Sequence, residues 1–241
     1  MVAVVLVATG TQQALAHTQL YNVAVGKTVY KKGQYIQTVV GPPLSPVADF
    51  TKNEIRCRNT DGTSPGTPYL CVVAGTTFSV NWHHHDDSPG DDMVSLSHRG
   101  PCMIYLGKVT PNPDDIKWFK IYHLGFNKDT NKWCSDVARD NHGKVDIVIP
   151  KDLENGKYLL RTDLLALHDA AVNMGAQFYP NCVQIHIIGS NKKFLTPPPD
   201  YVKFPGAYQP NDKGILYNIR TDKGLTYEIP GPAVYPPVQK P

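Results

Sequence analysis

Short apolar runs between turn residues dominate the middle of the chain and restrict it to folds built mainly from β-strands. The runs are alternately or continuously apolar and are bounded by glycine, proline or asparagine, as strands commonly are: 76–83, 102–109, 144–150, 156–167 and 178–189. Long segments with a helical period are missing, and only residues 137–140 and 169–173 suit a short helical turn. The pattern predicts an all-β antiparallel sandwich with long loops and short helical turns.

Length and composition agree with one such domain. The chain has 241 residues, enough to enclose a substantial core, and its 41% hydrophobic content excludes intrinsic disorder. The net charge is only +3 and no run of five basic residues occurs, so we expect no nucleic-acid binding. From Thr196 onward the chain is rich in Pro, Tyr and Gly, but apolar residues recur there. We therefore predict an ordered loop that wraps the domain rather than a disordered tail.

The first sixteen residues carry no charged side chain and indicate a secretory signal. An apolar run from Val2 to Ala8 precedes the small-residue ending Ala14-Leu15-Ala16. We predict a signal peptide over 1–16 and a single domain over 17–241. The apolar run is too short to span a bilayer, and no later segment reaches that length, so we expect a secreted, extracellular protein without a membrane part. The alternative interpretation of the first residues is a buried strand.

Cleavage after Ala16 makes His17 the first residue of the mature chain. A terminal histidine offers its α-amine and its ring Nδ1 to one metal ion, and together they close a six-membered chelate ring. One further imidazole completes a planar set of three nitrogens, which favours Cu(II). If cleavage occurs elsewhere, His17 is an ordinary residue.

The other histidines and the cysteines are less specific. In the run His83-His84-His85 only the first and third side chains point to the same side of an extended chain, and a loop facing solvent or ligand is favoured over a metal site. We interpret the isolated histidines as surface or structural residues: His123, His142 and His186. Five cysteines leave at least one unpaired, and Cys102, within an apolar run, suits a buried free thiol.

A series of short motifs, in order over nearly the whole mature chain, resembles the fungal lytic polysaccharide monooxygenases of auxiliary-activity family 9, formerly glycoside hydrolase family 61. The motifs are A-H-T (16–18), N-x-I-x-C (53–57), W-H-H (82–84), S-H-R-G-P (97–101), M-I-Y-L (103–106), W-F-K-I (118–121), G-K-Y-L-L-R (156–161), A-L-H-D-A (166–170), G-A-Q-F-Y-P-N-C-V-Q (175–184), F-P-G-A-Y (204–208), G-I-L-Y-N-I (214–219) and G-P-A-V (231–234). The resemblance implies an immunoglobulin-like or fibronectin III-like β-sandwich, in agreement with the strand pattern. It also implies that the single domain over 17–241 is the catalytic domain, and we expect no carbohydrate-binding module.

The resemblance also implies a copper site. His17 and His98 match the two histidines that bind one copper ion per chain, and Tyr179 matches the axial tyrosine. His168 and Gln177 match a neighbouring pair that positions and protonates the bound oxygen. Without the resemblance, Tyr179 would be interpreted as a core aromatic residue and His168 as a hydrogen-bonded core histidine.

Further residues are assigned by the same resemblance. Cys57 and Cys182 match the disulfide of the family, whereas the pairing of the other three cysteines stays open. The candidate substrate contacts on a flat binding face are Tyr208, His84, His85 and Asp169.

The implied activity is copper-dependent oxidative cleavage of β-1,4-glucan, chiefly cellulose, at C1 and/or C4. It would use O₂ or H₂O₂ and an external electron donor such as cellobiose dehydrogenase or a small reductant, and we expect a monomer. Two other functional classes agree less well with the sequence. Hydrolysis by paired carboxylates is disfavoured because no matched motif marks such a pair. A non-catalytic secreted protein that binds copper or carbohydrate would not need His168 and Gln177.

Overall fold

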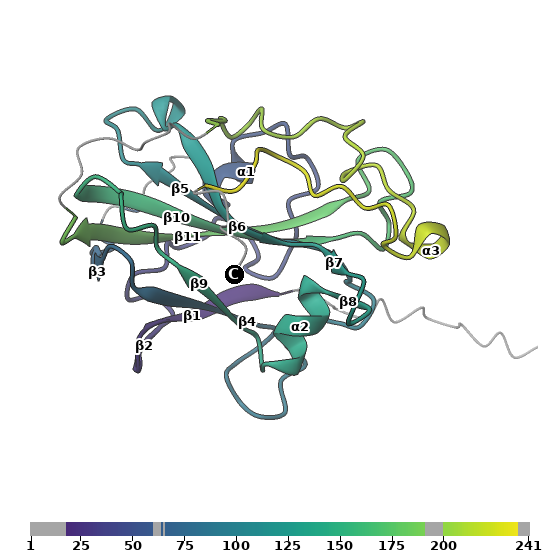
Figure 1. Ribbon diagram of the computed structural model, residues 1–241, viewed down its shortest axis with the longest axis horizontal. Helices are drawn as coiled ribbons and strands as arrows, with labels where there is room; N and C mark the ends of the chain where they lie inside the picture. The colour runs from purple at the N-terminus through teal and green to yellow at the C-terminus, as the bar shows by residue number, and fades with distance from the viewer. Residues whose placement is uncertain (1–17, 60–63, 65, 191–199, 236–241) are drawn as a thin grey trace, which may run out of the picture.

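The computed structural model describes residues 18–59, 64, 66–190 and 200–235, and it contains two β-sheets packed face to face (Figure 1). One sheet has the strand order β2-β1-β4-β9 and the other β3-β11-β10-β5-β6. This arrangement is an immunoglobulin-like β-sandwich, as predicted. The predicted signal peptide over 1–16 and the candidate ligand His17 lie outside the described residues.

The elements have the following bounds. The four-stranded sheet contains β1 (Gln19–Val25), β2 (Thr28–Lys31), β4 (Thr77–His83) and β9 (Lys144–Val148). The five-stranded sheet contains β3 (Leu70–Val73), β5 (Cys102–Lys108), β6 (Trp118–Leu124), β10 (Gly156–Ala166) and β11 (Gln177–Ile188). The short elements are the hairpin β7 (Phe126–Asn127) and β8 (Lys132–Trp133), the helices α1 (Glu54–Cys57), α2 (Cys134–Asp140) and α3 (Ile219–Asp222), and the 3₁₀ turn η1 (Pro113–Asp115).

Two details of the prediction are corrected. The sandwich is not purely antiparallel, because β3 runs parallel to β11 with Leu70 opposite Ile185. Residues 169–173 form turns rather than a helix, whereas the predicted turn over 137–140 lies within α2.

The five-stranded sheet is covered on both faces, which explains why its strands are nearly continuous apolar runs. Along β10, Leu160 and Leu164 pack into the core between the sheets. The alternate residues Leu159 and Leu165 pack into a second core on the outer face. Side chains of successive strand residues point to opposite faces, so a strand covered on both sides must be apolar at nearly every position.

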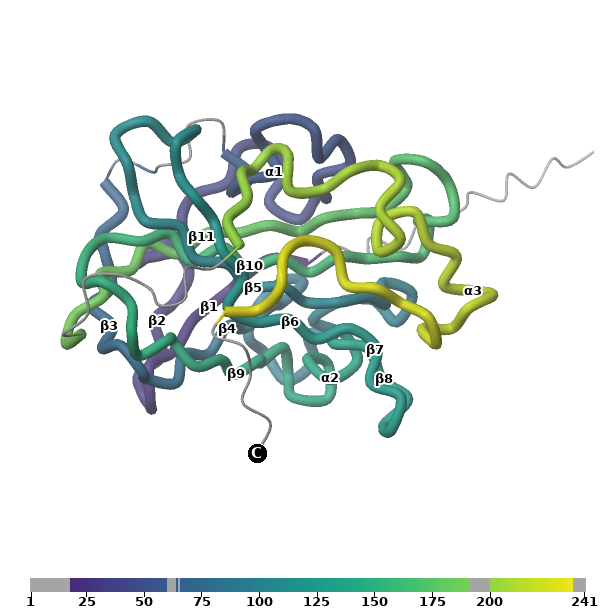
Figure 2. Tube along the Cα trace, turned by 45° about the horizontal axis from the view of Figure 1, so that its top comes forward, coloured from purple at the N-terminus to yellow at the C-terminus, as the bar shows by residue number. Residues whose placement is uncertain are grey.

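The outer core is closed by residues 200–235, here called the C-terminal strap. Figure 2 shows this segment, in yellow-green and yellow, crossing the outer side of the five-stranded sheet. It pairs with the edge strand β6 at two isolated bridges, Trp118 with Val202 and Lys120 with Val234. Its buried side chains are Phe204, Tyr208, Ile215, Tyr217 and Tyr235. The predicted ordered loop is therefore confirmed over the described part of this segment.

Two disulfides each join a short helix to a strand of the five-stranded sheet. Cys57 of α1 is bonded to Cys182 of β11, as the resemblance implied. Cys102 of β5 is bonded to Cys134 at the start of α2, which corrects the expectation that Cys102 is a free thiol. Cys71 is the free cysteine, and it is exposed on β3.

Candidate functional site

His98 and Tyr179, the described residues matched to the copper ligands, lie near each other where β10 ends and β11 begins. His98 lies in the loop between β4 and β5, and this loop is fixed to the end of β10 by a hydrogen bond from the Leu167 amide to the Arg99 carbonyl at 2.9 Å. Gln177 is the first residue of β11 and lies opposite Ala166. Segments distant in sequence are thereby held together by backbone hydrogen bonds.

Three aromatic side chains cluster at this end of the sandwich. The rings of His98 and His168 stack with centroids 4.1 Å apart, and the centroids of His98 and Tyr179 are 6.1 Å apart. His98 is only 5% exposed, and its Nδ1 is hydrogen-bonded to Ser97 Oγ at 3.0 Å. The structure therefore brings His98, His168 and Tyr179 together, and it restricts the orientation of the His98 ring.

Tyr179 is held against Gln177. The Tyr179 hydroxyl donates a hydrogen bond to Gln177 Oε1 at 3.1 Å, which orients the amide. Burial raises the pKa of the Tyr179 phenol far above its ordinary value, although the nearby Arg58 guanidinium acts in the opposite direction. The phenol is therefore neutral at physiological pH and serves as a hydrogen-bond donor.

His168 has an uncommon environment for a histidine. Burial lowers the pKa of its imidazole, while the Asp169 carboxylate raises this pKa and the Arg220 guanidinium lowers it. Its Nε2 lies 3.2 Å from Asp169 Oδ2, and its buried Nδ1 has no hydrogen-bond partner among the described residues. A neutral ring beside His98 can accept or donate one proton, which suits general acid–base work.

The beginning of β1 lies close to this cluster. Thr18 is buried, and its Oγ1 donates to the carbonyl oxygen of His83 at 3.4 Å, which fixes the start of β1 beside the end of β4. Asn181 lines a groove together with the first residues of β1, and its Nδ2 donates to the carbonyl oxygen of Tyr179 at 3.2 Å. The chain that follows the predicted cleavage point therefore enters the fold next to the segment carrying Tyr179.

The donor set is compatible with copper. His98 offers an imidazole and Tyr179 a phenol, and His17 would add an amine and a second imidazole. Within the part of the chain that the structure describes, no group of three or more His, Cys, Asp or Glu side chains is arranged to hold a metal ion. The remaining predicted ligand, His17, lies outside the described residues.

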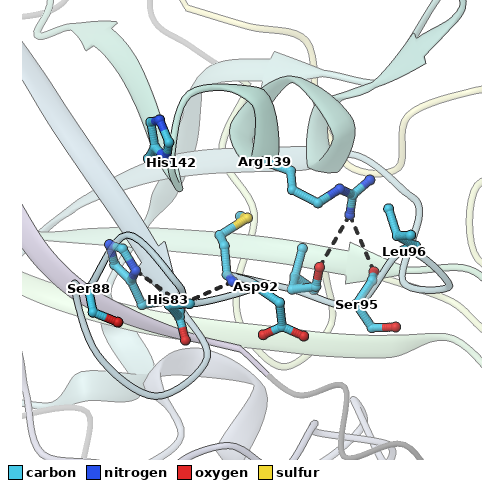
Figure 3. A pocket seen from close by; sticks show the side chains of 10 residues that line it. His83, Ser88, Asp92, Ser95, Leu96, Arg139 and His142 are labelled. Atoms are coloured by element: carbon cyan, nitrogen blue, oxygen red, sulfur yellow. Dashed lines mark hydrogen bonds and ion pairs between the residues drawn. The ribbon is translucent and has the colours of Figure 1, made fainter.

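The His83-His84-His85 run is folded around one carboxylate. Asp91 Oδ2 lies 3.1 Å from His83 Nδ1, and the same side chain accepts hydrogen bonds from the amides of His84 and His85 at 2.9 and 2.8 Å. Burial alone would raise the pKa of Asp91, but these donors hold it below its ordinary value. Figure 3 shows the pocket beside this loop, where the Arg139 side chain reaches the loop backbone.

Two of the candidate substrate contacts, Tyr208 and His84, are buried in the structure. Tyr208 is 3% exposed, stacks on Phe178 with centroids 5.0 Å apart and donates to the Tyr105 hydroxyl at 3.0 Å, so it belongs to the outer core. His84 is 6% exposed, and its Nδ1 lies 2.8 Å from Asp92 Oδ1. By contrast, His85 and Asp169 are available at the surface: His85 is exposed, and the Asp169 side chain is 54% exposed.

The motifs did not reveal a set of basic residues beside His168. Arg99, Arg220 and Lys223 line one hollow together with His168 and Trp133. These residues come from four segments that are distant in sequence, and the path of the C-terminal strap brings them together. No local sequence signal could have grouped them.

Comparison with known proteins decides the family. A model of Auxiliary Activity family 9, formerly GH61, matches residues 13–227. The chain belongs to auxiliary activity family 9. It is 38% identical over 229 residues to AA9 family lytic polysaccharide monooxygenase C of Botryotinia fuckeliana, covering 91% of this chain and 70% of that protein. It is 36% identical over 194 residues to AA9 family lytic polysaccharide monooxygenase A of Aspergillus kawachii, covering 80% of this chain and 46% of that protein. The chain spans about half the length of several curated relatives that it matches.

Solved AA9 structures have the same fold. CvAA9A is 30% identical with a TM-score of 0.80, and the alignment covers 91% of this chain and 98% of CvAA9A. Cel61B from Hypocrea jecorina, described as a glycoside hydrolase family 61 member, is 27% identical with a TM-score of 0.77 over 91% of this chain and all of its own. The family resemblance seen in the sequence is therefore confirmed. None of the helices in the described residues has the length and apolar character needed to cross a membrane.

Proposed function

We propose that the mature protein is a copper-dependent lytic polysaccharide monooxygenase that cleaves β-1,4-glucan, chiefly cellulose, at C1 and/or C4. The observation that carries the proposal is the cluster of His98, His168 and Tyr179 at one end of an AA9 sandwich, with His98 and His168 stacked at 4.1 Å. The relatives named above are lytic polysaccharide monooxygenases, which supports the same reaction class.

In this proposal copper would be held by His17, through its amine and ring, by His98 and by Tyr179. Copper bound there would supply the one-electron chemistry of O₂ or H₂O₂ that protein side chains lack. Tyr179 packs against the site from the core and excludes water on that side. Its hydroxyl holds the Gln177 amide in place at 3.1 Å, so this amide can orient a small oxygen ligand by hydrogen bonding.

In this proposal His168 is the residue that accepts and donates protons beside His98. Its lowered pKa keeps the ring neutral at physiological pH, so one ring nitrogen carries a proton and the other can accept one. Asp169 Oδ2, 3.2 Å from Nε2, favours the tautomer in which Nε2 carries the proton. The exposed His85 and Asp169 are the remaining candidates for substrate contacts.

The proposal includes secretion and an external electron source. The electron donor would be cellobiose dehydrogenase or a small reductant, and the protein would act outside the cell as a monomer. The proposal also includes removal of the predicted signal peptide over 1–16, which would free the amine of His17.

A product analysis tests the reaction class. The mature protein beginning at His17, loaded with copper and given ascorbate and cellulose, is expected to release oxidised oligosaccharides, and mass spectrometry distinguishes C1 from C4 products. Release of non-oxidised sugars alone would point to hydrolysis and overturn the proposal.

Two variants test the copper ligands. A protein retaining one extra residue before His17, and His98→Ala, should each lose the type-2 Cu(II) electron paramagnetic resonance spectrum, because each removes nitrogen ligands. Gln177→Ala should keep the spectrum, because this side chain is not a ligand. It should slow turnover, because the amide that orients the oxygen species is lost. Unchanged copper binding in the first two variants would show that the assigned ligands are wrong.

A further inference from the structure

A hollow of about 480 Å³ opens beside His168 at the candidate site. Its size falls within the range of small-molecule sites in proteins. The segments that form it are the loop before β5, the hairpin β7–β8 with the start of α2, the turn after β10, and α3 with Lys223 of the C-terminal strap. Its lining residues include Arg99, Phe126, Trp133, Asp136, His168, Arg220 and Lys223. We call this hollow the basic groove.

Two cations of the basic groove form no ion pair with any residue that the structure describes. Asp136, the carboxylate that lines the groove, is bonded to Arg139 and lies 3.5 Å from Arg99 Nε. Arg220 and Lys223 have no acidic side chain within ion-pair distance among the residues that the structure describes. These two side chains therefore remain able to bind an anion.

The neighbouring Asp222 does not neutralise them by contact. Its carboxylate accepts hydrogen bonds from the Tyr217 hydroxyl, the Thr226 hydroxyl and the Thr226 amide. These donors lower its pKa to about 2, so the carboxylate stays charged and turned toward Tyr217 and Thr226. Its remaining effect on the two cations acts without an ion-pair contact and is screened by salt.

The backbone that carries the two cations is fixed. Asn218 Oδ1 accepts from the Arg220 amide at 3.1 Å, and the Gly224 amide donates to the Tyr217 hydroxyl at 2.8 Å. Lys223 ends α3 in the left-handed conformation with φ 57°. The positions of Arg220 and Lys223 relative to the sheet are therefore set by the fold before any ligand arrives, which reduces the entropy lost on binding.

The basic groove is continuous with the site proposed above, because His168 belongs to both. Arg220 lies close enough to His168 to influence its charge state. The half-buried Phe126 provides an apolar wall of the kind that suits a sugar ring. A neutral glucan offers hydroxyl groups but no anion to Arg220 and Lys223, whereas a carboxylate matches the planar donor geometry of a guanidinium.

We infer that the basic groove binds a carboxylate carried by the polysaccharide chain, and that acidic oligosaccharides are therefore preferred ligands of this protein. This inference rests on the proposed function, since it extends the substrate surface of the same site. The carboxylate has two possible sources, a uronic acid side group or an aldonic acid at an oxidised chain end. Both present the same chemistry to Arg220 and Lys223.

Calorimetric titration without reductant tests the inference on the full mature protein. The ligands are a neutral cello-oligosaccharide, the same oligosaccharide with an aldonic acid end, a neutral xylo-oligosaccharide, and its counterpart with one glucuronic acid substituent. We expect at least one acidic ligand to bind about tenfold more tightly than its neutral partner at low ionic strength, and high salt to reduce this preference. The ligand that shows the preference identifies the source of the carboxylate.

The double variant Arg220→Gln, Lys223→Gln should abolish the preference. The matched control is the double variant Lys27→Gln, Lys31→Gln, which lowers the net charge by the same amount as the groove variant. These two lysines lie at or next to β2, at the end of the sandwich opposite α3 (Figure 1). This control should keep the preference. Equal affinity for acidic and neutral ligands in the unmodified protein, or a preference that persists in the groove variant, would overturn the inference. Failure of the oxidative activity on cellulose would instead overturn the proposed function, because the titration needs no turnover.

Discussion

At the scale of single residues, a buried ion pair on β10 joins three parts of the molecule. Arg161 Nη2 donates to Asp163 Oδ2 at 2.8 Å, and its Nε donates to the carbonyl oxygen of Arg56 at 2.9 Å. The guanidinium carbon lies 4.0 Å from the ring centroid of Phe204 in the C-terminal strap. One side chain therefore contacts β10, α1 and the strap, and all of these contacts are shielded from water.

Arg161→Met is expected to lower the free energy of unfolding by about 3–5 kcal/mol, because it leaves the buried Asp163 carboxylate without its cation. Urea denaturation measures this change. Lys108→Met is the control, because Lys108 and Glu154 form an exposed ion pair whose loss should cost at most about 1 kcal/mol. Equal losses in both variants would contradict the assigned role of Arg161.

Tyr208 illustrates the limit of assigning residues from motifs. The F-P-G-A-Y motif has the glycine and proline of a surface turn, and the family resemblance suggested an exposed sugar-stacking ring. The outer core instead covers Tyr208, because Phe178 and Phe204 form an aromatic cluster around it. Burial of this kind depends on the path of the strap, which no single motif encodes.

At the scale of elements, β6 is the strand that receives the C-terminal strap. The Lys120 ammonium is fully buried and donates to the carbonyl oxygen of Pro230 at 2.7 Å, and the Tyr235 amide donates to the Lys120 carbonyl oxygen at 2.7 Å. Burial lowers the pKa of Lys120 to about 7. Burial and the nearby Lys120 lower the pKa of His123 to about 4, so His123 is neutral above pH 5.

The lowered pKa of Lys120 predicts that the free energy of unfolding depends on pH. From pH 7 upward, the folded chain binds fewer protons at Lys120 than the unfolded chain does, so stability should rise with pH toward the ordinary lysine pKa. Lys120→Met should remove this rise, whereas the exposed Lys128→Met should not. Urea midpoints at about pH 7 and pH 9 measure the difference. A constant difference between the native protein and Lys120→Met over this range would contradict the prediction.

The strands differ in how well the sequence predicted them. The apolar runs correctly predict β4, β5, β9, β10 and β11, because these strands are buried and therefore rich in apolar residues. In β6, Lys120 and His123 interrupt the apolar pattern, so the strand was missed even though Lys120 is fully buried. The grouping of His98, His168 and Tyr179 followed from the family resemblance. The basic groove followed from neither pattern nor family, because Arg220 and Arg99 meet through tertiary packing.

At the scale of the whole molecule, two disulfides close loops of very different length. The Cys57–Cys182 bond has a sequence separation of 125 and joins α1 to the five-stranded sheet. The Cys102–Cys134 bond has a separation of 32 and joins that sheet to α2. A disulfide restricts the unfolded chain, and the restriction grows with the length of the closed loop.

Replacing Cys57 and Cys182 by alanine should therefore lower the free energy of unfolding by about 4–5 kcal/mol, and replacing Cys102 and Cys134 by about 1 kcal/mol less. Denaturant unfolding of both double variants provides the comparison. A larger loss from the shorter loop would indicate that packing around the sulfur atoms, and not chain entropy, controls these contributions.

Cys71 has a practical consequence for attaching the protein to a support. The other four cysteines are bonded in pairs, and this thiol is exposed on β3, at the end of the sandwich opposite α3 and the basic groove (Figure 1). A maleimide dye or a gold electrode would therefore couple at a single defined point. Every immobilised molecule would then present its histidine cluster to the solution in the same orientation.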